Sequence, residues 1–306
     1  MKKIFVMALM GMVAAGCSNE CVDLVENGQE LNGLGRDGQT ETAVAPVRVH
    51  VSGFKVDQAD FTRSAEDVAN YNGVNVVTLA FYDGSTEVYK VRQERDGMAE
   101  GETFGEFSLY LPMGSYQMVA VACKVSGTSP FTLTSATVAA FTGAHAQDTF
   151  VASGEVAITS TDDVDISATL ERIVSQLKVA STDEKTSDVQ NVRMTLSGGS
   201  RSFNPTTGWA IGNAGFANTV GFTTTGDGEL SSSLTYLFLT SDNQTMDVTI
   251  ETLDAQGDVI YGTTVTDVPF KRNRKTVLTG ALYTNAPLSG GFKVETDWLQ
   301  DYNMGF

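Results

Sequence analysis

The feature that most limits the possible folds is an alternation of apolar and polar residues with a period of two, which begins near residue 45. The stretch "VRVHVSGF" places Val47, Val49 and Val51 on one side of an extended chain and polar side chains on the other. Such alternation is typical of a strand with one buried face. Similar short runs, separated by turn residues, recur to the end of the chain without a long helical pattern. We therefore predict an all-β fold of the sandwich type.

Local signals predict how some of these runs are connected. Turn residues at 83–84 and 256–257 each join two runs rich in β-forming residues, which predicts two hairpins. The stretch "FGEFSLYLPMGSYQMVAVACKV" is interpreted as another strand pair that turns at 112–114. One short helix is predicted over 63–71, because a serine and an aspartate three residues apart resemble a helix start.

The run "VDISATLERIVSQLKVAST" is long for one strand, and the spacing of Leu170, Ile173, Val174 and Leu177 also fits a helix. Strand and helix both remain open there, and we place the passage into a second domain at this point. The expected organisation is a signal peptide at 1–16, a polar tether or leader at 17–43, an N-terminal sandwich at 44–168 and a C-terminal sandwich at 169–306.

The N-terminus has the order of a secretion signal. Two lysines precede an uncharged, mostly apolar run at 4–15, which is shorter than the roughly 20 residues of a membrane-spanning helix. Small residues lead directly into Cys17, which resembles the lipobox of bacterial lipoproteins. By this resemblance, which we favour over a buried helix with an ordinary cysteine, cleavage falls between Gly16 and Cys17, and Cys17 receives acyl chains such as palmitate. Because Ser18 and not an aspartate follows, the resemblance implies sorting to the outer membrane.

The charge of the chain limits its partners. Its 306 residues include 20 Lys and Arg but 37 Asp and Glu, for a net charge of −17. Nucleic-acid binding depends mainly on cations that neutralise phosphates, so we expect no nucleic-acid partner. Docking on anionic lipid through a basic face is also disfavoured. The balance suits a protein on a surface whose copies repel one another.

No catalytic or metal site is predicted. His50 and His145 lie outside any recognisable nucleophile motif, and no strand-to-helix nucleophile elbow is present in the sequence. The acidic residues Asp162, Asp163 and Asp165 lack the glycine and glutamate of a calcium-binding EF-hand loop, so a solvated turn is favoured. Glycine-rich stretches lack the lysine and serine of a phosphate-binding loop. We therefore expect a protein that is not an enzyme and needs no cofactor.

Two further features keep alternatives open. Cys123 lies in an apolar run, so a buried free thiol is favoured over a disulfide with Cys21. The stretch "PFKRNRKTVLTG" is basic in an otherwise acidic chain. It is either a charged turn, which we favour, or a contact for an acidic partner or a neighbouring subunit. Its cations are Lys271, Arg272, Arg274 and Lys275.

Three motifs, together with the lipoprotein signal, resemble a known family. "LPMGSYQMVAVA", "LERIVSQLKV" and "VPFKRNRKTVLTGALYT" look like segments of the fimbrillin-type lipoproteins of Bacteroidales, which include FimA-like stalk subunits, tip subunits and anchor subunits. The resemblance implies two tandem β-sandwich domains of transthyretin-like topology that polymerise by strand donation. It also implies removal of a leader by an arginine-specific protease, for which Arg36 is a better candidate than Arg48 or Arg63.

The function expected from this resemblance is that of a lipid-anchored fimbrial (pilus) subunit or pilus-associated adhesin in cell-surface attachment. The expected partners are other fimbrial subunits, the outer membrane through lipid, and a host or bacterial surface ligand. The alternative is a surface glycan-binding lipoprotein of a polysaccharide uptake system, which would need exposed aromatic residues such as Trp209 or Trp298. Stalk, anchor and tip roles all remain open.

Overall fold

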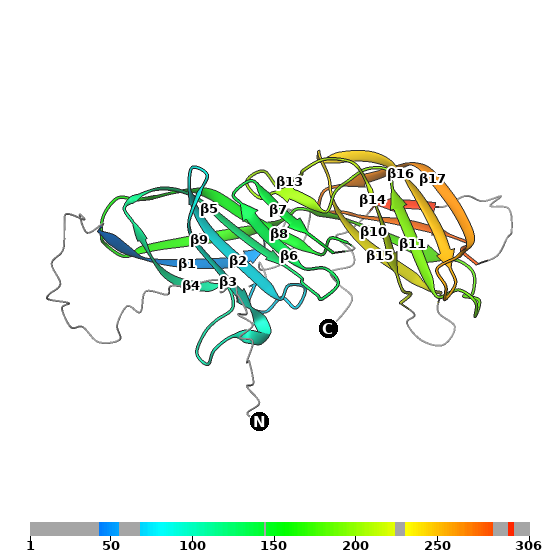
Figure 1. Ribbon diagram of the computed structural model, residues 1–306, viewed down its shortest axis with the longest axis horizontal. Helices are drawn as coiled ribbons and strands as arrows, with labels where there is room; N and C mark the ends of the chain where they lie inside the picture. The colour runs from blue at the N-terminus through cyan, green and yellow to red at the C-terminus, as the bar shows by residue number, and fades with distance from the viewer. Residues whose placement is uncertain (1–42, 55–67, 144, 224–229, 284–292, 297–306) are drawn as a thin grey trace, which may run out of the picture. The chain divides into compact units, whose positions relative to one another are not determined.

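The regular elements are strands joined by short turns. The computed structural model describes residues 43–54, 68–143, 145–223, 230–283 and 293–296. Within these ranges the only other element is a short 3-10 helix, η1 (Arg95–Gly97). The strands form two sandwiches and a small additional sheet (Figure 1). The all-β sandwich prediction is confirmed.

The first sandwich is a single seven-stranded sheet in the order β3-β2-β5-β8-β9-β1-β4. The sheet folds between β8 and β9, so that its two parts face each other as two layers. Its strands are β1 (Val44–Phe54), β2 (Val76–Asp83), β3 (Thr86–Glu94), β4 (Glu106–Pro112), β5 (Gly114–Cys123), β8 (Thr149–Ile158) and β9 (Val164–Arg172). One layer holds β3, β2, β5 and β8, and the other holds β9, β1 and β4. The core lies between these layers.

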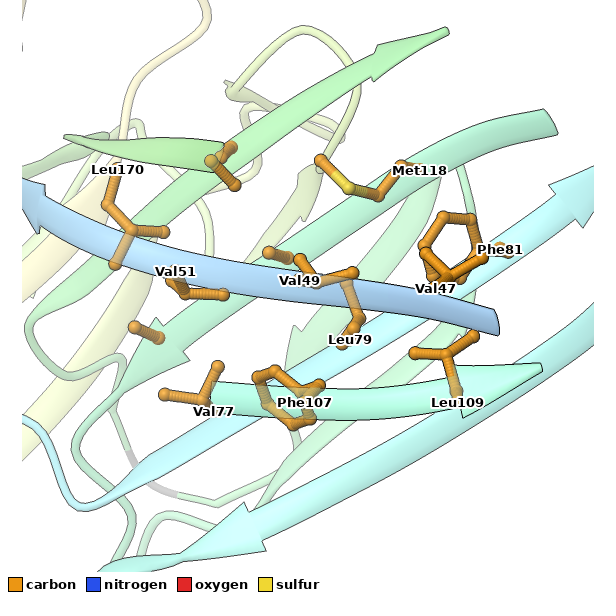
Figure 2. Packing of buried hydrophobic residues seen from close by; sticks show 14 of the residues in the cluster. Val47, Val49, Val51, Val77, Leu79, Phe81, Phe107, Leu109, Met118 and Leu170 are labelled. Atoms are coloured by element: carbon orange, nitrogen blue, oxygen red, sulfur yellow. The ribbon is translucent and has the colours of Figure 1, made fainter. Parts of the chain in front are cut away.

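The period-two alternation in the sequence explains this core. Val47, Val49 and Val51 of β1 are buried and face Leu79 and Phe81 of β2 in the opposite layer (Figure 2). Their polar neighbours along β1 point away from the core, as alternation in a strand requires. Each such side chain contributes about 1.5–3 kcal/mol to stability through burial.

The second sandwich has two four-stranded sheets, β15-β10-β18-β19 and β14-β11-β16-β17. Its strands are β10 (Val174–Ser181), β11 (Asn191–Leu196), β14 (Phe216–Val220), β15 (Ser232–Phe238), β16 (Asn243–Leu253), β17 (Val259–Lys271), β18 (Lys275–Gly280) and β19 (Lys293–Thr296). Apolar residues of both sheets form its core, among them Leu177, Met194 and Ile250.

The two sandwiches share one topology, although their sequences show no internal repeat. In the first, β1 pairs in parallel with β9 and antiparallel with β4. In the second, β10 pairs in parallel with β18 and antiparallel with β15. The sheets β3-β2-β5-β8 and β14-β11-β16-β17 also correspond strand by strand. Each of the seven strands of the first sandwich therefore has a definite counterpart in the second.

A small additional sheet is separate from the two sandwiches. It has the order β13-β12-β7-β6, with strands β6 (Phe131–Ser135), β7 (Val138–Phe141), β12 (Ser202–Asn204) and β13 (Trp209–Ala210). Aromatic rings gather beneath it, and the rings of Phe203 and Phe238 have centroids 4.4 Å apart. Because β7 precedes residue 168 and its partner β12 follows it, this sheet joins segments from both expected domains.

The local predictions can now be compared with the strands. The hairpins at 83–84 and 256–257 are confirmed, since β2 pairs with β3 and β16 pairs with β17. The ambiguous run around residue 170 is two strands, β9 and β10, separated by Ile173. For the helix predicted over 63–71, residues 63–67 lie outside the described residues and 68–70 form a turn. The division at residue 168 stays a prediction, and β9 continues across it.

The strand pair predicted around 112–114 is wrong. β4 pairs with β1, whereas β5 pairs with β2 and β8, so the two strands lie in opposite layers with only Met113 between them. Leu111 of β4 and Tyr116 of β5 are both buried in the first core. The crossing places β4 and β5 on opposite sides of the first core, where the apolar faces of the two strands meet.

Candidate strand-acceptor groove

The first sandwich has a gap where its two layers meet. β8 and β9 pair only at Phe150 with Arg172 and at Val151 with Glu171. β5 covers the inner edge of β8 along its whole length, and β1 covers one edge of β9. Among the described strands, none pairs with the outer edge of β8 beyond Val151 or with the second edge of β9 before Glu171. Two strand edges therefore diverge from one point.

A groove of about 430 Å³ lies in this gap, and we call it the acceptor groove. Apolar side chains line part of it, including Met118, Val156, Ile166 and Ala168. Met118 and Ala168 are buried in the first core, and Val156 and Ile166 pack against that core while remaining half-buried. The groove thus combines an apolar lining with the backbone N–H and C=O groups of two strand edges.

The second sandwich shows how the equivalent position can be filled. β18 corresponds to β9, and its second edge pairs antiparallel with β19, from Thr276 opposite Thr296 to Thr279 opposite Lys293. In the first sandwich no described strand takes this place beside β9. The acceptor groove is therefore the site where the shared topology lacks one strand among the described elements.

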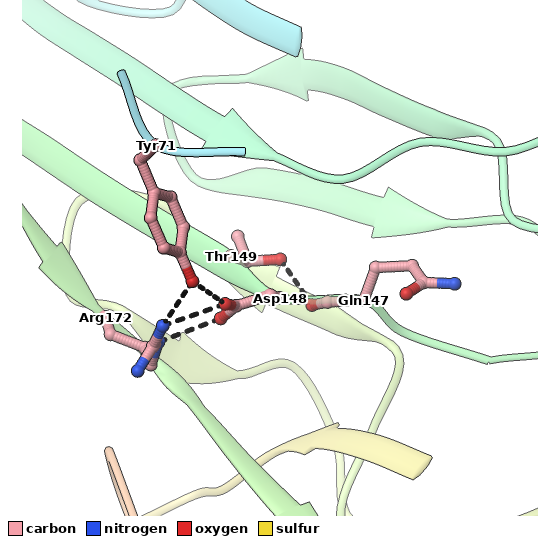
Figure 3. A network of polar contacts seen from close by, with 5 residues as sticks. All are labelled: Tyr71, Gln147, Asp148, Thr149 and Arg172. Atoms are coloured by element: carbon pink, nitrogen blue, oxygen red, sulfur yellow. Dashed lines mark hydrogen bonds and ion pairs between the residues drawn. The ribbon is translucent and has the colours of Figure 1, made fainter. Parts of the chain in front are cut away.

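A buried polar network lies where β8 and β9 pair (Figure 3). Arg172, the last residue of β9, donates from Nε to Asp148 Oδ1 and from Nη2 to Asp148 Oδ2, both at 2.9 Å. The Tyr71 hydroxyl donates to Asp148 Oδ2 at 3.1 Å and accepts from Arg172 Nη2 at 2.9 Å. The Arg172 guanidinium also lies 4.6 Å from the centroid of the Phe150 ring. This two-pronged pairing fixes the geometry of both charged groups.

The charges of the network follow from its surroundings. Burial, the largest single influence, would lower the pKa of Arg172, but Asp148 together with Tyr71 and Tyr236 outweighs it and raises the pKa, so the guanidinium stays charged. Burial, followed by the negative charge of Asp148, raises the pKa of Tyr71, so its hydroxyl keeps its proton. Burial likewise raises the pKa of Tyr236 of β15. The network is therefore a fixed ion pair with neutral hydroxyl groups around it.

A second cation, Arg272, lines the acceptor groove. Arg272 Nη2 lies 3.9 Å from Glu171 Oε2, and its guanidinium lies 4.7 Å from the centroid of the Trp209 ring. Gly208 has a positive φ of 71°, and a Cβ there would come within 2.9 Å of both Arg272 Nη2 and a methyl group of Ile173. Glycine is thus needed for the turn that carries Trp209 beneath Arg272.

The structure separates the four predicted basic residues. Lys271 and Arg274 line a hollow on the second sandwich, Arg272 lines the acceptor groove, and the Lys275 side chain is buried. Gly16, Cys17 and Arg36 lie outside the described residues.

The structure also places Cys123, His50 and His145, which the sequence analysis considered. Cys123 is a buried free thiol, and burial raises its pKa. His50 contacts the Glu106 carboxylate on an exposed face, and burial lowers the pKa of His145. Within the described residues, no group of three or more His, Cys, Asp or Glu side chains is placed to hold a metal ion. No helix in this part of the chain is long and apolar enough to cross a membrane.

Comparison with known families gives one match. Residues 40–304 match the model of DUF6562, described as a family of unknown function. The chain belongs to this family. None of the curated proteins compared with this DUF6562 chain is recognisably similar to it.

Solved structures similar to the DUF6562 chain include proteins from Porphyromonas and Bacteroides species. The fimbrial anchor protein Mfa2 from Porphyromonas gingivalis is 11% identical, with a TM-score of 0.47, over 83% of this chain and 96% of that one. A candidate adhesin from Bacteroides ovatus is 13% identical, with a TM-score of 0.47, over 72% and 77%. A candidate polysaccharide-binding protein from Bacteroides thetaiotaomicron is 10% identical, with a TM-score of 0.49, over 85% and 99%.

Proposed function

We propose that this chain is a lipid-anchored structural subunit of a cell-surface fimbria, without enzymatic activity, and that it joins other subunits by accepting a strand in the acceptor groove. The observation that carries the proposal is the divergence of β8 and β9, which are unpaired with each other beyond Val151 of β8 and before Glu171 of β9. It leaves two strand edges that no described strand pairs with. An inserted strand would satisfy the backbone groups of both edges and cover the apolar lining in one step.

The second sandwich suggests the direction of the inserted strand. β19 runs antiparallel to β18, and β18 is the counterpart of β9. The donated strand therefore runs antiparallel to β9, with alternate side chains directed at Ile166 and Ala168. Main-chain hydrogen bonds would supply affinity, and the fit of the alternate side chains would supply specificity.

Lipid at Cys17 is proposed as the anchor in the outer membrane, with the folded part exposed at the cell surface. Replacing Cys17 by serine is expected to move the protein from the membrane fraction to the soluble fraction, because each buried acyl methylene contributes about 0.8 kcal/mol to anchoring. Cell fractionation and intact mass would measure this. Cys21→Ser is the matched control and should stay in the membrane; equal release of both variants would contradict an anchor at Cys17.

Processing is the second test of the proposed role. Treatment of the native protein with an arginine-specific protease is expected to shorten it near Arg36 and to yield an SDS-resistant ladder, because removal of the leader would make the groove accessible to a neighbour's strand. Intact mass and Western blotting would measure both events. Arg36→Lys should block them. A chain that keeps its acylated N-terminus and stays monomeric after treatment would be an anchor or a stand-alone lipoprotein instead of a polymerising stalk subunit.

The glycan-binding alternative gains no support from the described aromatic residues. A sugar platform needs an accessible ring face, but Trp209 is half-buried and has the Arg272 guanidinium 4.7 Å from its ring centroid. Trp298 lies outside the described residues. A host or bacterial surface ligand remains part of the adhesin proposal, and no observation on the described surface favours a particular one.

A further inference from the structure

The second sandwich carries a basic hollow of about 340 Å³ beside the turn between β17 and β18. Two cations line it, Lys271 and Arg274, together with the polar side chains of Asn243, Gln244 and Thr245. The Lys271 Nζ lies 3.8 Å from Asp242 Oδ2, in an exposed pair that contributes little to stability. Arg274 has no carboxylate partner among the described residues, and its Nη1 donates to the carbonyl of Asn273. The hollow is thus a cationic site on a chain whose net charge is −17.

The turn that presents these cations is held rigidly. The Arg272 N–H donates to the carbonyl of Asp242 at 3.0 Å, and the Asn273 N–H donates to the carbonyl of Val174 at 2.9 Å. The Arg274 carbonyl accepts from the Gln176 N–H at 3.0 Å. Asn273 adopts a positive φ of 55°, which asparagine tolerates better than most residues. Because the backbone is fixed, little of it would need to be ordered when an anion binds.

The matching anionic feature is the turn between β8 and β9, the topological counterpart of the β17–β18 turn. It carries Asp162 and Asp163, and Asp165 follows at the start of β9. All three are exposed, and the side chains of Asp163 and Asp165 are 61% and 77% exposed. Arg48 lies 3.4 Å from Asp163 and 3.9 Å from Asp165, so one cation faces this acidic turn within the chain.

The acidic turn lies too far from the basic hollow to occupy it within one molecule. The acidic turn directly precedes Val164, the first residue of β9. Near the other end of β9, Glu171 lies 3.9 Å from Arg272, which belongs to the same turn as Lys271 and Arg274. The seven residue steps from Val164 to Glu171 span roughly 23 Å in a strand. The geometry points to a head-to-tail contact in which the acidic turn of one copy of this chain docks in the basic hollow of the next copy.

A second copy fits this hollow better than a small ligand or a glycan. Small-ligand pockets are mostly apolar and aromatic, whereas four of the seven residues that line this hollow have charged or amide side chains. The one aromatic residue in its lining, Phe270, is only 2% exposed and offers no ring face for a sugar. A head-to-tail contact uses different surfaces on the two copies, so it extends along a line of subunits unless its rotation closes a ring. The proposed contact rests on the subunit role above and adds an orienting step that precedes strand insertion.

The test uses the leader-intact chain, purified from membranes in detergent without protease, so that strand insertion does not contribute. A mixture of ¹⁴N- and ¹⁵N-labelled protein is treated at low salt with a carbodiimide, which joins a lysine amine directly to a contacting carboxylate. Mass spectrometry should find Lys271 joined to Asp162 or Asp163 of a differently labelled copy. A link from Lys271 to Asp242 within one copy serves as the internal positive control. The intermolecular link should disappear in 0.5 M salt, where screening acts over about 4 Å.

Charge reversal makes the test specific. Lys271→Glu with Arg274→Glu, or Asp162→Lys with Asp163→Lys, should each weaken self-association in analytical ultracentrifugation at least tenfold, and mixing the two variants should restore it. Lys124→Glu with Lys185→Glu changes the net charge equally at exposed sites and should have less effect. Loss of the link without rescue by mixing, or equal effects of the control, would overturn the proposal. Binding of oligogalacturonate to the hollow by an otherwise monomeric chain would overturn it in favour of a glycan site.

Discussion

Replacing Asp148 by asparagine is expected to lower the free energy of unfolding by about 3–5 kcal/mol, because it leaves Arg172 charged inside the protein without its counter-ion. The side chains of Arg172 and Asp148 are only 5% and 9% exposed. Arginine does not lose its proton in proteins, so the buried guanidinium cannot escape this cost by becoming neutral. Urea unfolding of the variant and of the unmodified chain would measure the difference.

Two further variants show whether the charge is responsible. Arg48→Ala removes the exposed cation near Asp163 and Asp165, and should change the stability by less than about 1 kcal/mol. Replacing both partners, with Asp148→Leu and Arg172→Met, should recover much of the loss, since a buried ion pair is often no more stable than an apolar pair of similar volume. If Asp148→Asn costs no more than Arg48→Ala, another group must compensate Arg172.

The functional importance of this ion pair comes from its place in the fold. Asp148 precedes β8 and Arg172 ends β9, so the pair fixes the point from which the two strand edges diverge. Tyr71 adds a hydroxyl from a third segment of the first sandwich. Loosening the pair should therefore change the width of the acceptor groove as well as the stability of the sandwich.

The sequence predicted the strands better than their partners. Alternation identified β1, and turn residues identified the hairpins at 83–84 and 256–257, because both signals act between residues close in the chain. The parallel pairing of Val47 with Val164 has no such local signal. The lack of a local signal for strand pairing also explains the wrong prediction at 112–114, where consecutive strands lie in opposite layers.

The candidate site was less accessible to sequence analysis. The acceptor groove lies along strand edges that do not pair. The amino-acid composition of a strand does not reveal whether its edge is paired. One clue was present: Ala168, Leu170 and Arg172 share one face of β9, and all three are buried. A cation in phase with buried apolar residues requires a counter-ion, although the alternation does not indicate that Asp148 supplies it.

Replacing Ile166 by lysine is expected to reduce protease-induced polymerisation at least tenfold while leaving the monomer folded. Ile166 is half-buried and lines the acceptor groove, so a lysine there can keep its charged end in water while the groove is open. A strand inserted beside β9 would cover this position and force the charge out of water, which is costly without a partner. The SDS-resistant ladder after arginine-specific cleavage would measure the effect.

The matched control is Ile260→Lys in the second sandwich. Ile260 lies on β17, is 40% exposed, and is not among the residues that line the acceptor groove. It undergoes the same chemical change at an exposed strand position and should leave the ladder intact. Circular dichroism melts of both variants should resemble that of the unmodified chain. If the two lysine variants polymerise equally well, subunits join somewhere other than the gap between β8 and β9. If only Ile166→Lys fails and its melt is unchanged, the groove accepts the strand.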